Sequence, residues 1–561
     1  MFLFLGGLLA SRLFFIQVKG HDFYLVQSDR QYSFYKSPES ISLRGSIYFK
    51  EKGGEIISAA TIKDGFLVAV NPDLINKPEY VCGEIGKIVF AGFDKDDCAK
   101  RAGKKGDPYE VVAHRLDSGE SEKIQALGIG GVNTFREQWR FYPGNSFASQ
   151  VLGFVGYKGD DLVGRYGLEQ YYEDILRGEK ENLKESASFA MLFLELGKNF
   201  LGTDAYGGHD IVLTIEPRVQ SFLENVLVDV VAKWSAESAG GVIIDPKTGA
   251  IYAMSSKPDF NPNTYGEVDN ISYFRNPLVS SIFEVGSVMK TLTLAAALDA
   301  GKITAETTYF DNGFLVFNGK RIENYDGKGR GTIDMQTVLN QSLNTGAVFA
   351  MQQLGKDKFL NYLKNFGLDE ITGIDLPDEI EGRLTNLSSM RDIEYATASF
   401  GQGIAVSPIE FTMAVSSLAN GGLLMEPRVV EKIIVQGGQN NEMKPVISRR
   451  VLKSETSREI TRMLVNVVDE ALLGGAEKME HYTVAAKTGT AQLVNVGGTG
   501  YYDDQYFHSF FGYAPAFDAK FLIFLYVKKP QGVKYASNTL TEPFMNLMKF
   551  LLNYYEVPPD R

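Results

Sequence analysis

Residues 283–301 of this chain read FEVGSVMKTLTLAAALDAG, and this stretch decides the fold class. It is strongly apolar and rich in alanine, which predicts a buried helix that Gly301 ends. Lys290 is the only charged residue between Glu284 and Asp299. A lysine inside such a helix would be partly desolvated, and desolvation favours the neutral amine over the ammonium.

Ser287 stands three positions before Lys290, so a helix places both side chains on one face, about one turn apart. A neutral amine there could take the proton of the serine hydroxyl and so produce a nucleophile. The helix N-terminus adds free backbone N–H groups where an oxyanion would develop. A helix-capping serine beside a snorkelling lysine is the alternative interpretation, because S-x-x-K matches arise by accident.

Two further motifs follow along the chain. Ser342-Leu-Asn344 interrupts two apolar helical stretches, where Ser and Asn could instead cap the following helix. Lys487-Thr-Gly-Thr490 lies in alternating, β-branched sequence that predicts a strand, and Gly489 permits another backbone to approach it closely. A lysine and two hydroxyls on a strand suit a peptide carboxylate that docks along its edge. The three motifs are weak separately and strong in this order.

S-x-x-K, S-x-N and K-T-G in this order resemble the signature of the penicillin-recognising serine enzymes. The likeness extends over most of the chain, and the chain most resembles the class B penicillin-binding proteins. Five segments carry it around and before the motifs: RFYPG (140–144), YGLE (166–169), RNPLVSSIFEVGSVMK (275–290), FGQGIAVSPIEFTMAVSSLANGG (400–422) and SFFGYAPA (509–516). The chain departs from the family at Val285, where proline is usual, at Leu343, and after Arg44-Gly-Ser-Ile47. None of these departures removes a chemical group from the site.

The resemblance implies a role for each motif residue. Ser287 would attack the D-Ala-D-Ala carbonyl of a stem peptide, with Lys290 as the base and Ser342 as the proton relay to the leaving amine. Substrate binding would fall to Asn344, which would hold the amide, and to the segment that binds the terminal carboxylate: Lys487, Thr488, Gly489 and Thr490. Backbone N–H groups of Ser287 and Thr490 would form the oxyanion hole. An amine of a neighbouring stem peptide would then take the acyl group, without a metal or organic cofactor.

The same resemblance implies a multidomain α+β fold. We expect a membrane anchor at 1–18, an elongated pedestal of the dimerisation type at 19–210, and a penicillin-binding transpeptidase domain at 211–561. The transpeptidase domain would hold an antiparallel sheet between helical layers. The apolar start, MFLFLGGLLASRLFFIQV, lacks a preceding basic residue and a cleavage site, so it predicts the distal part of a single-pass anchor, although a core helix would read similarly. The catalytic domain would then lie outside the cytoplasmic membrane of a bacterium.

Composition narrows the function classes. The 561 residues are 44% hydrophobic and 22% charged, which indicates a folded chain of more than one domain. Net charge is −12 without a Lys/Arg cluster, which disfavours nucleic acid as a partner. The Cys and His spacing is not that of a zinc site. Cys82 and Cys98 could form a disulfide in an oxidising compartment, or remain two buried thiols.

The expected partners are peptidoglycan stem peptides, β-lactams, the membrane and a polytopic SEDS-type glycosyltransferase. One alternative is a D,D-carboxypeptidase or a β-lactam-hydrolysing or β-lactam-sensing enzyme of the same superfamily. Another is a catalytically silent scaffold of wall synthesis, which the three chemically complete motifs disfavour. Within the family, the spacing from Gly313 to Asn344 and the segment SLNTGAVF resemble the division-specific type more than the elongation type.

Overall fold

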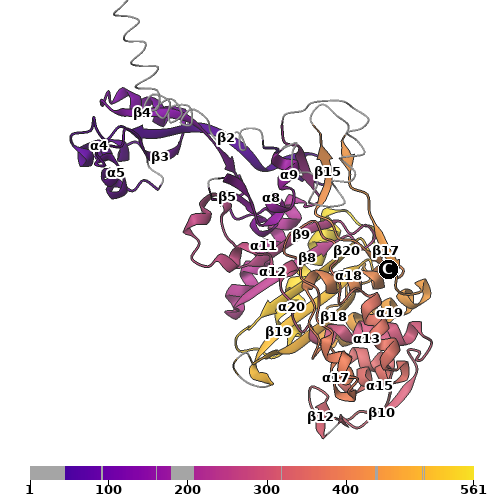
Figure 1. Ribbon diagram of the computed structural model, residues 1–561. Coiled ribbons are helices and arrows are strands. Elements are labelled where there is room, and N and C mark those ends of the chain that lie inside the picture. The colour runs from indigo at the N-terminus through magenta and orange to yellow at the C-terminus, as the bar shows by residue number, and fades with distance from the viewer. Residues whose placement is uncertain are drawn as a thin grey trace, which may run out of the picture.

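The computed structural model describes residues 44–89, 92–159, 161–177, 207–317, 319–435, 440–495, 497 and 500–561. The predicted anchor at 1–18 therefore lies outside the described residues. Within these ranges no helix combines the length and the apolar character that a membrane crossing requires. Figure 1 shows a slender N-terminal part that projects from a much larger C-terminal part.

The N-terminal part is built around one long strand. Strand β2 (Ile56–Val70) pairs with β1 (Ile47–Lys50) at its beginning and with β3 (Glu110–Leu116) and β4 (Val132–Phe141) further along, always antiparallel. Three helices pack around the far end of this ribbon: α4 (Pro78–Gly86), α5 (Lys95–Ala102) and α6 (Ser118–Ala126). The continuous β2 ribbon carries this helical head away from the rest of the molecule (Figure 1).

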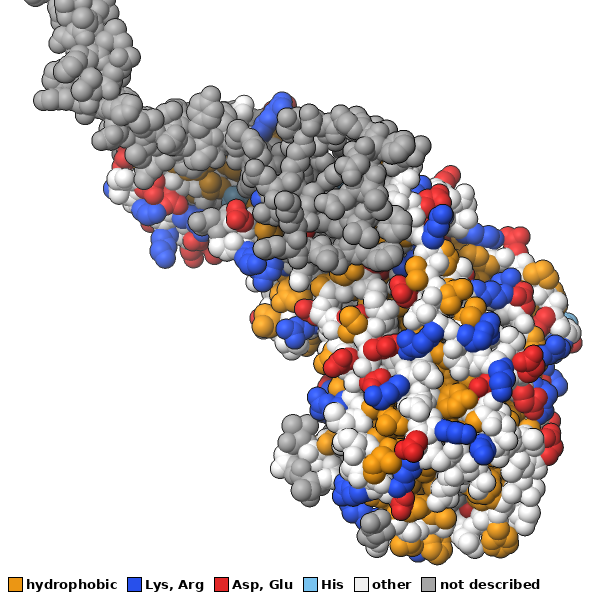
Figure 2. Space-filling view, turned by 45° about the vertical axis from the view of Figure 1, so that its right-hand side comes forward, with side chains coloured by type: hydrophobic (Ala, Val, Ile, Leu, Met, Phe, Trp, Pro, Cys, Tyr) orange, Lys and Arg blue, Asp and Glu red, His pale blue; other side chains and the backbone are white. Residues whose placement is uncertain are grey.

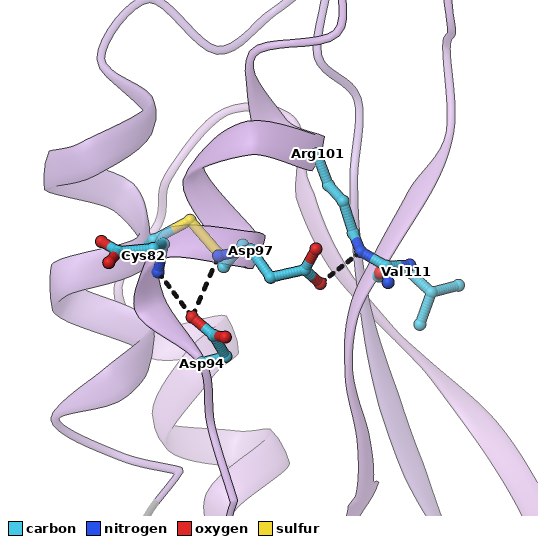
Figure 3. Close-up of a disulfide and its surroundings, with 7 residues drawn as sticks. Cys82, Asp94, Asp97, Arg101 and Val111 are labelled. Carbon is cyan, nitrogen blue, oxygen red and sulfur yellow. Dashed lines mark hydrogen bonds and ion pairs between the residues drawn. A yellow bond between two sulfur atoms is a disulfide. The ribbon is translucent and has the colours of Figure 1, made fainter.

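A disulfide joins two of the three helices of the head. Cys82 on α4 and Cys98 on α5 are bonded, with their Cα atoms 5.9 Å apart (Figure 3). Beside them the Asp94 side chain caps α5 by accepting hydrogen bonds from the backbone N–H groups of Asp96 and Asp97. The disulfide is the first of the two alternatives that the sequence left open. A crosslink that closes a loop of this size stabilises by about 3 kcal/mol in the chain-entropy model.

A mixed sheet joins the two parts of the molecule. Strand β7 (Asp210–Leu213) lies parallel to β1 and antiparallel to β15 (Val430–Ile434), which in turn pairs with β16 (Asn441–Glu442). Residues from both predicted domains therefore share one sheet. The domain limits at 18 and 210 stay predictions, because β7 bonds to strands on both sides of the second limit.

The pattern of GRYGLEQYYEDILRG (164–178) predicts a single amphipathic helix, and this prediction is wrong. The first residues of this segment form β6 (Asp161–Arg165), which pairs with β5 (Phe154–Lys158), and two short helices follow: α8 (Gly167–Tyr171) and α9 (Glu173–Arg177). Tyr166 and Gly167 have φ of +59° and +49°, so the backbone turns sharply between strand and helix. An amphipathic pattern cannot reveal such a turn.

The C-terminal part contains the predicted antiparallel sheet between helical layers. The strand order is β18-β19-β20-β8-β9, and every neighbouring pair is antiparallel. The strands are β8 (Ser238–Ile244), β9 (Ile251–Lys257), β18 (Ala485–Val494), β19 (Tyr501–Ala514) and β20 (Phe521–Lys528). One face packs against α11 (Pro217–Trp234) and α20 (Ala536–Tyr554). The other packs against α18 (Pro408–Ala419) and α19 (Ser454–Asn466). Both faces are thus buried, as the apolar runs in β8 and β20 require.

A helical lobe completes this part beside α13 (Met289–Asp299). Its helices are α14 (Met335–Asn340), α15 (Asn344–Leu354), α16 (Lys356–Asn365) and α17 (Asp392–Ala398). Two small strand pairs extend from it: β10 (Thr308–Asp311) with β13 (Gly331–Asp334), and β11 (Phe314–Phe317) with β12 (Lys320–Glu323). In Figure 2, side chains of both charge signs alternate over the described surface of this part. The functional cleft lies between the helical lobe and the edge strand β18.

Candidate active site

The predicted nucleophile lies in a tight turn that leads into α13. Ser287 belongs to the one-turn 3-10 segment Gly286–Val288, so the predicted helix begins as a 3-10 turn and continues as α13. Gly286 has φ of +68°, and a Cβ placed there would meet the Thr490 carbonyl oxygen at 2.7 Å. Only glycine fits such a position without displacing a backbone. The turn is therefore held directly against β18, with Ser287 beside Thr490.

Lys290 follows the serine by one helical turn and is completely buried. Burial, and next the charge of Lys487, lowers its pKa well below the usual lysine value. Its Nζ donates to the Ser342 carbonyl oxygen at 2.5 Å and contacts the Ser342 Oγ at 3.3 Å. The sequence predicted this desolvated amine from a lone lysine in an apolar helix, and the burial confirms it. An amine held partly neutral can accept a proton.

Ser342 connects the two buried lysines. Its Oγ accepts from Lys487 Nζ at 2.9 Å as well as facing Lys290. The Ser342 backbone has φ of +52°, a conformation that a non-glycine residue adopts only under strain, and such strain clusters at functional sites. The capping alternative is wrong, because α15 is capped by Leu343 without any side-chain hydrogen bond. Leu343 itself is buried, so this departure from the family faces the core and not the cleft.

Asn344 begins α15 and faces the same cleft. Its Nδ2 donates to the Glu323 carbonyl oxygen at 2.7 Å, which orients the amide from the β12 side. The next residue, Thr345, is tied to the buried Asp311 through a 2.8 Å hydrogen bond. This network fixes the start of α15 and with it the side of the cleft that carries Ser342.

Strand β18 supplies the opposite wall. Lys487 is 3% exposed, and burial lowers its pKa to about 7. A Cβ on Gly489 would meet the Val285 carbonyl oxygen at 2.6 Å, so glycine is needed for the strand to approach the nucleophile turn. The Thr490 Oγ1 accepts from the backbone N–H of Ala536, at the start of α20, at 3.0 Å. Val285 keeps the backbone path of a proline, with φ of −82°.

The predicted side chains converge on one cleft of about 1520 Å³. Its lining includes Ser287, Ser342, Asn344, Lys487, Thr488 and Thr490. Of the other two predicted residues, Lys290 is buried against Ser342 and Gly489 lies in the strand against the turn. A hydroxyl, a buried amine, a bridging serine and strand-edge donors in one cleft are the groups that acyl transfer through a serine ester needs.

Glu284 also lines this cleft, three residues before Ser287, although no sequence motif marks it as a site residue. Its carboxylate accepts from the Gly403 N–H at 3.0 Å and from the Tyr501 hydroxyl at 3.1 Å. Burial raises the pKa of Glu284 to about 7. A carboxylate in an otherwise apolar segment was the available signal, but its partners lie more than 100 residues away, at separations of 119 and 217.

Fold and site together define a serine acyl-transfer enzyme of the penicillin-recognising class. The family model of the penicillin binding protein transpeptidase domain matches residues 239–549, and that of the penicillin-binding protein dimerisation domain matches 39–190. The chain therefore belongs to the penicillin-binding protein family, in its class B branch, and is a peptidoglycan D,D-transpeptidase. An elongated N-terminal domain of the dimerisation type on a transpeptidase fold is confirmed.

Relatives and solved structures agree with this membership. Stage V sporulation protein D of Bacillus subtilis is 33% identical over 525 residues, which are 91% of this chain and 80% of the relative. Peptidoglycan D,D-transpeptidase FtsI of Buchnera aphidicola is 26% identical and aligns over 81% of this chain and 77% of its own. The crystal structure of penicillin binding protein 3 from Mycobacterium tuberculosis with aztreonam has a TM-score of 0.66 at 26% identity, covering 76% of this chain and 92% of that one.

Proposed function

We propose that this enzyme cross-links stem peptides through an acyl-enzyme on Ser287. Lys290 takes the hydroxyl proton as Oγ attacks the D-Ala-D-Ala carbonyl, the C–N bond breaks, and Ser342 passes a proton to the departing D-Ala amine. Asn344 holds the substrate amide, and the terminal carboxylate binds at Lys487, Thr488 and Thr490, with Gly489 keeping the strand close. The backbone N–H groups of Ser287 and Thr490 form the oxyanion hole.

One observation carries this proposal: Lys290 is completely buried and donates to Ser342 within 2.5 Å. A lysine buried without a carboxylate partner costs stability, so its retention is explained by proton transfer more readily than by structure. The bridging Ser342 Oγ, 2.9 Å from Lys487 Nζ, supports a proton path between the two lysines.

Product analysis with penicillin and an acceptor amine tests the proposal. Penicillin should leave a long-lived adduct on Ser287, detected by mass spectrometry and absent in Ser287→Ala. A donor thioester should yield mainly the aminolysis product when the amine is saturating. If water remains the main acceptor, the enzyme is a D,D-carboxypeptidase, and rapid release of penicilloate would make it a β-lactamase. An absent adduct on folded protein would support the silent scaffold.

We further propose that residues 1–18 anchor the protein, with the catalytic domain outside the cytoplasmic membrane, and that it works with a SEDS-type glycosyltransferase in septal or elongation synthesis. The apolar run in this segment supports the anchor. Expressed in a bacterium, the chain should sediment with membranes and resist alkaline extraction. A shortened form released into the medium would contradict the anchor, and failure to co-purify any polytopic glycosyltransferase would contradict the partner.

A further inference from the structure

The catalytic cleft continues past Ser342 and Lys487 into a second arm. Asn340 and Gln341, which directly precede Ser342, line one wall, and Ala486, which precedes Lys487, lines the other. The segment Val467–Gly475, which follows α19, closes this arm, and its first part, Val467–Ala471, packs against both α14 and β18. We call this region the distal arm; the wall residues used below are Glu470, Leu472 and Leu473.

The backbone of the closing segment is irregular in two ways. Val467–Ala471 forms a single π-turn, an arrangement that is rare in helices and frequent at functional sites. Leu473 follows with φ of +48° and is 48% exposed, although a leucine disfavours both a left-handed backbone and water. The fold nevertheless keeps the apolar Leu473 side chain on the wall of the cleft, at the cost of this unfavourable backbone and exposure.

Glu470 gives the distal arm its charge. Among the described residues that line the cleft in this arm, Glu470 and Lys487 carry the charged side chains. Asp469, the neighbour of Glu470, is bound by the Arg561 guanidinium at 2.8 Å, whereas Glu470 forms no ion pair with the described part of the chain. Its carboxylate is exposed to the cleft and available to a cation.

The direction of the reaction decides what enters this arm. In the proposed mechanism the departing D-Ala amine receives its proton at Ser342. Formation of the new amide is the reverse of that cleavage, so microscopic reversibility puts the acceptor nitrogen where the departing nitrogen was. The distal arm adjoins Ser342 and Lys487, so it can receive the chain that carries the acceptor nitrogen.

We propose that the distal arm binds the acyl acceptor, a primary amine on an aliphatic side chain of a second stem peptide. Glu470 attracts its ammonium group, and Leu472 and Leu473 contact its methylene chain. This inference rests on the proposed function. The ammonium loses one proton to solvent, and its nitrogen attacks the ester carbonyl. As the C–N bond forms and the ester C–O bond breaks, the second proton passes through Ser342 and Lys290 to Ser287 Oγ.

Aminolysis of a thioester donor by two amines of different charge tests the assignment. N-acetylcadaverine is cationic at pH 7 and carries an aliphatic chain, whereas hydroxylamine is neutral and small. Glu470→Gln should raise the half-saturating concentration of N-acetylcadaverine roughly 3–10-fold, the range for one charge-assisted contact near water. Hydroxylamine saturation and the rate of Ser287 acylation by penicillin should stay unchanged. Equal changes for both amines, or none, would overturn the proposal.

Three further variants separate the contributions. Asp503→Asn removes the same charge at the β18–β19 end of the cleft and should leave both amines unaffected. Glu470→Asp should retain most of the discrimination. Leu473→Gly relieves the left-handed backbone and removes the apolar wall, so it should weaken N-acetylcadaverine only. If no amine yields an aminolysis product although penicillin still acylates Ser287, the transpeptidase function fails and not the assignment of Glu470 alone.

Discussion

Among the described residues, buried cations occur in two regions, and their surroundings differ. Where the N-terminal part meets the rest, Arg44 and Arg140 both bond to the fully buried Glu169, at 2.8 and 2.6 Å. In the cleft, Lys290 and Lys487 are equally buried, but within the described chain neither pairs with a carboxylate. One region neutralises its buried charges and the other leaves them uncompensated.

The proton affinities follow from this difference. Burial alone would raise the pKa of Glu169, but Arg140 and Arg44 more than offset burial and lower it. Burial lowers the pKa of both lysines. The side chains of the paired Glu169 cluster keep fixed charges and hold the surrounding elements together. An unpaired buried lysine is instead partly neutral and able to exchange a proton. The comparison therefore assigns structure to the first region and chemistry to the second.

The largest expected effect comes from making the cleft cation permanent. Lys290→Arg keeps the charge, but a guanidinium cannot be deprotonated in a protein. Acylation of Ser287 by penicillin should fall roughly 10²–10⁴-fold, the usual loss for a general base. Stopped-time labelling followed by mass spectrometry measures the rate, and a thermal melt verifies the fold. Unimpaired acylation in a folded variant would show that Lys290 acts only as a fixed charge.

Substitutions in the Glu169 cluster should lower the free energy of unfolding without changing the acylation rate of the folded enzyme. Glu169→Gln leaves two buried guanidinium groups beside a neutral amide, and breaking a buried pair in this way costs about 3–5 kcal/mol. Denaturant unfolding should report this loss, while the folded fraction still acylates at the normal rate. Glu173→Gln is the matched control, because Glu173 also pairs with Arg44 but its side chain is 20% exposed. There the loss should be smaller than for Glu169→Gln, because Glu173 is partly exposed and Glu169 still pairs with both guanidinium groups.

The sequence predicted the chemical groups of the site well and their contacts poorly. Ser287 and Lys290 were recognisable because one helical turn separates them, and local periodicity is readable from a single chain. The bridge from Lys487 to Ser342 spans 145 residues, and no local pattern encodes such a contact. The distal arm was missed for the same reason, since Glu470 and Asn340 meet only through tertiary packing.

The same distinction holds for the fold. The antiparallel sheet of the C-terminal part was implied by the family resemblance, and the strand that carries Lys487 was readable from its alternating, β-branched sequence. The mixed sheet through β7 was not, because β7 is four residues long and pairs with strands far away in sequence. Glu169 was recognisable in the sequence only as part of the family segment YGLE. Its pairing with Arg44 was not predictable, because Arg44 lies 125 residues away.

A pH dependence set by Lys487 sharpens the comparison further. Its pKa of about 7 means that the ammonium is present below pH 7 and the neutral amine above. Penicillin carries a carboxylate, so its second-order acylation rate should fall above pH 7 and approach a tenfold loss per pH unit, as for any single required protonation state. Glu284 also has a pKa of about 7 and could produce the same profile, so Glu284→Gln is the control. If Lys487 is the titrating group, the fall in rate should persist in this variant. Lys487→Arg should be slower at pH 6 but flat from pH 6 to pH 9, because guanidinium stays charged.

Unfolding cannot account for this loss at high pH. An unfolded lysine titrates near 10.4, so between about pH 7 and 10 the unfolded chain binds the proton that the folded chain has released. Stability then rises with pH across this window, and the Lys487 contribution makes the folded enzyme more stable while it acylates more slowly. Parallel pH series of acylation rate and denaturant midpoint should diverge. Lys487 is not the titrating group if the acylation rate and the denaturant midpoint fall together above pH 7, or if Lys487→Arg shows the same pH profile as the unaltered enzyme. Its burial would then serve the stability of the fold, as the burial of the Glu169 cluster does.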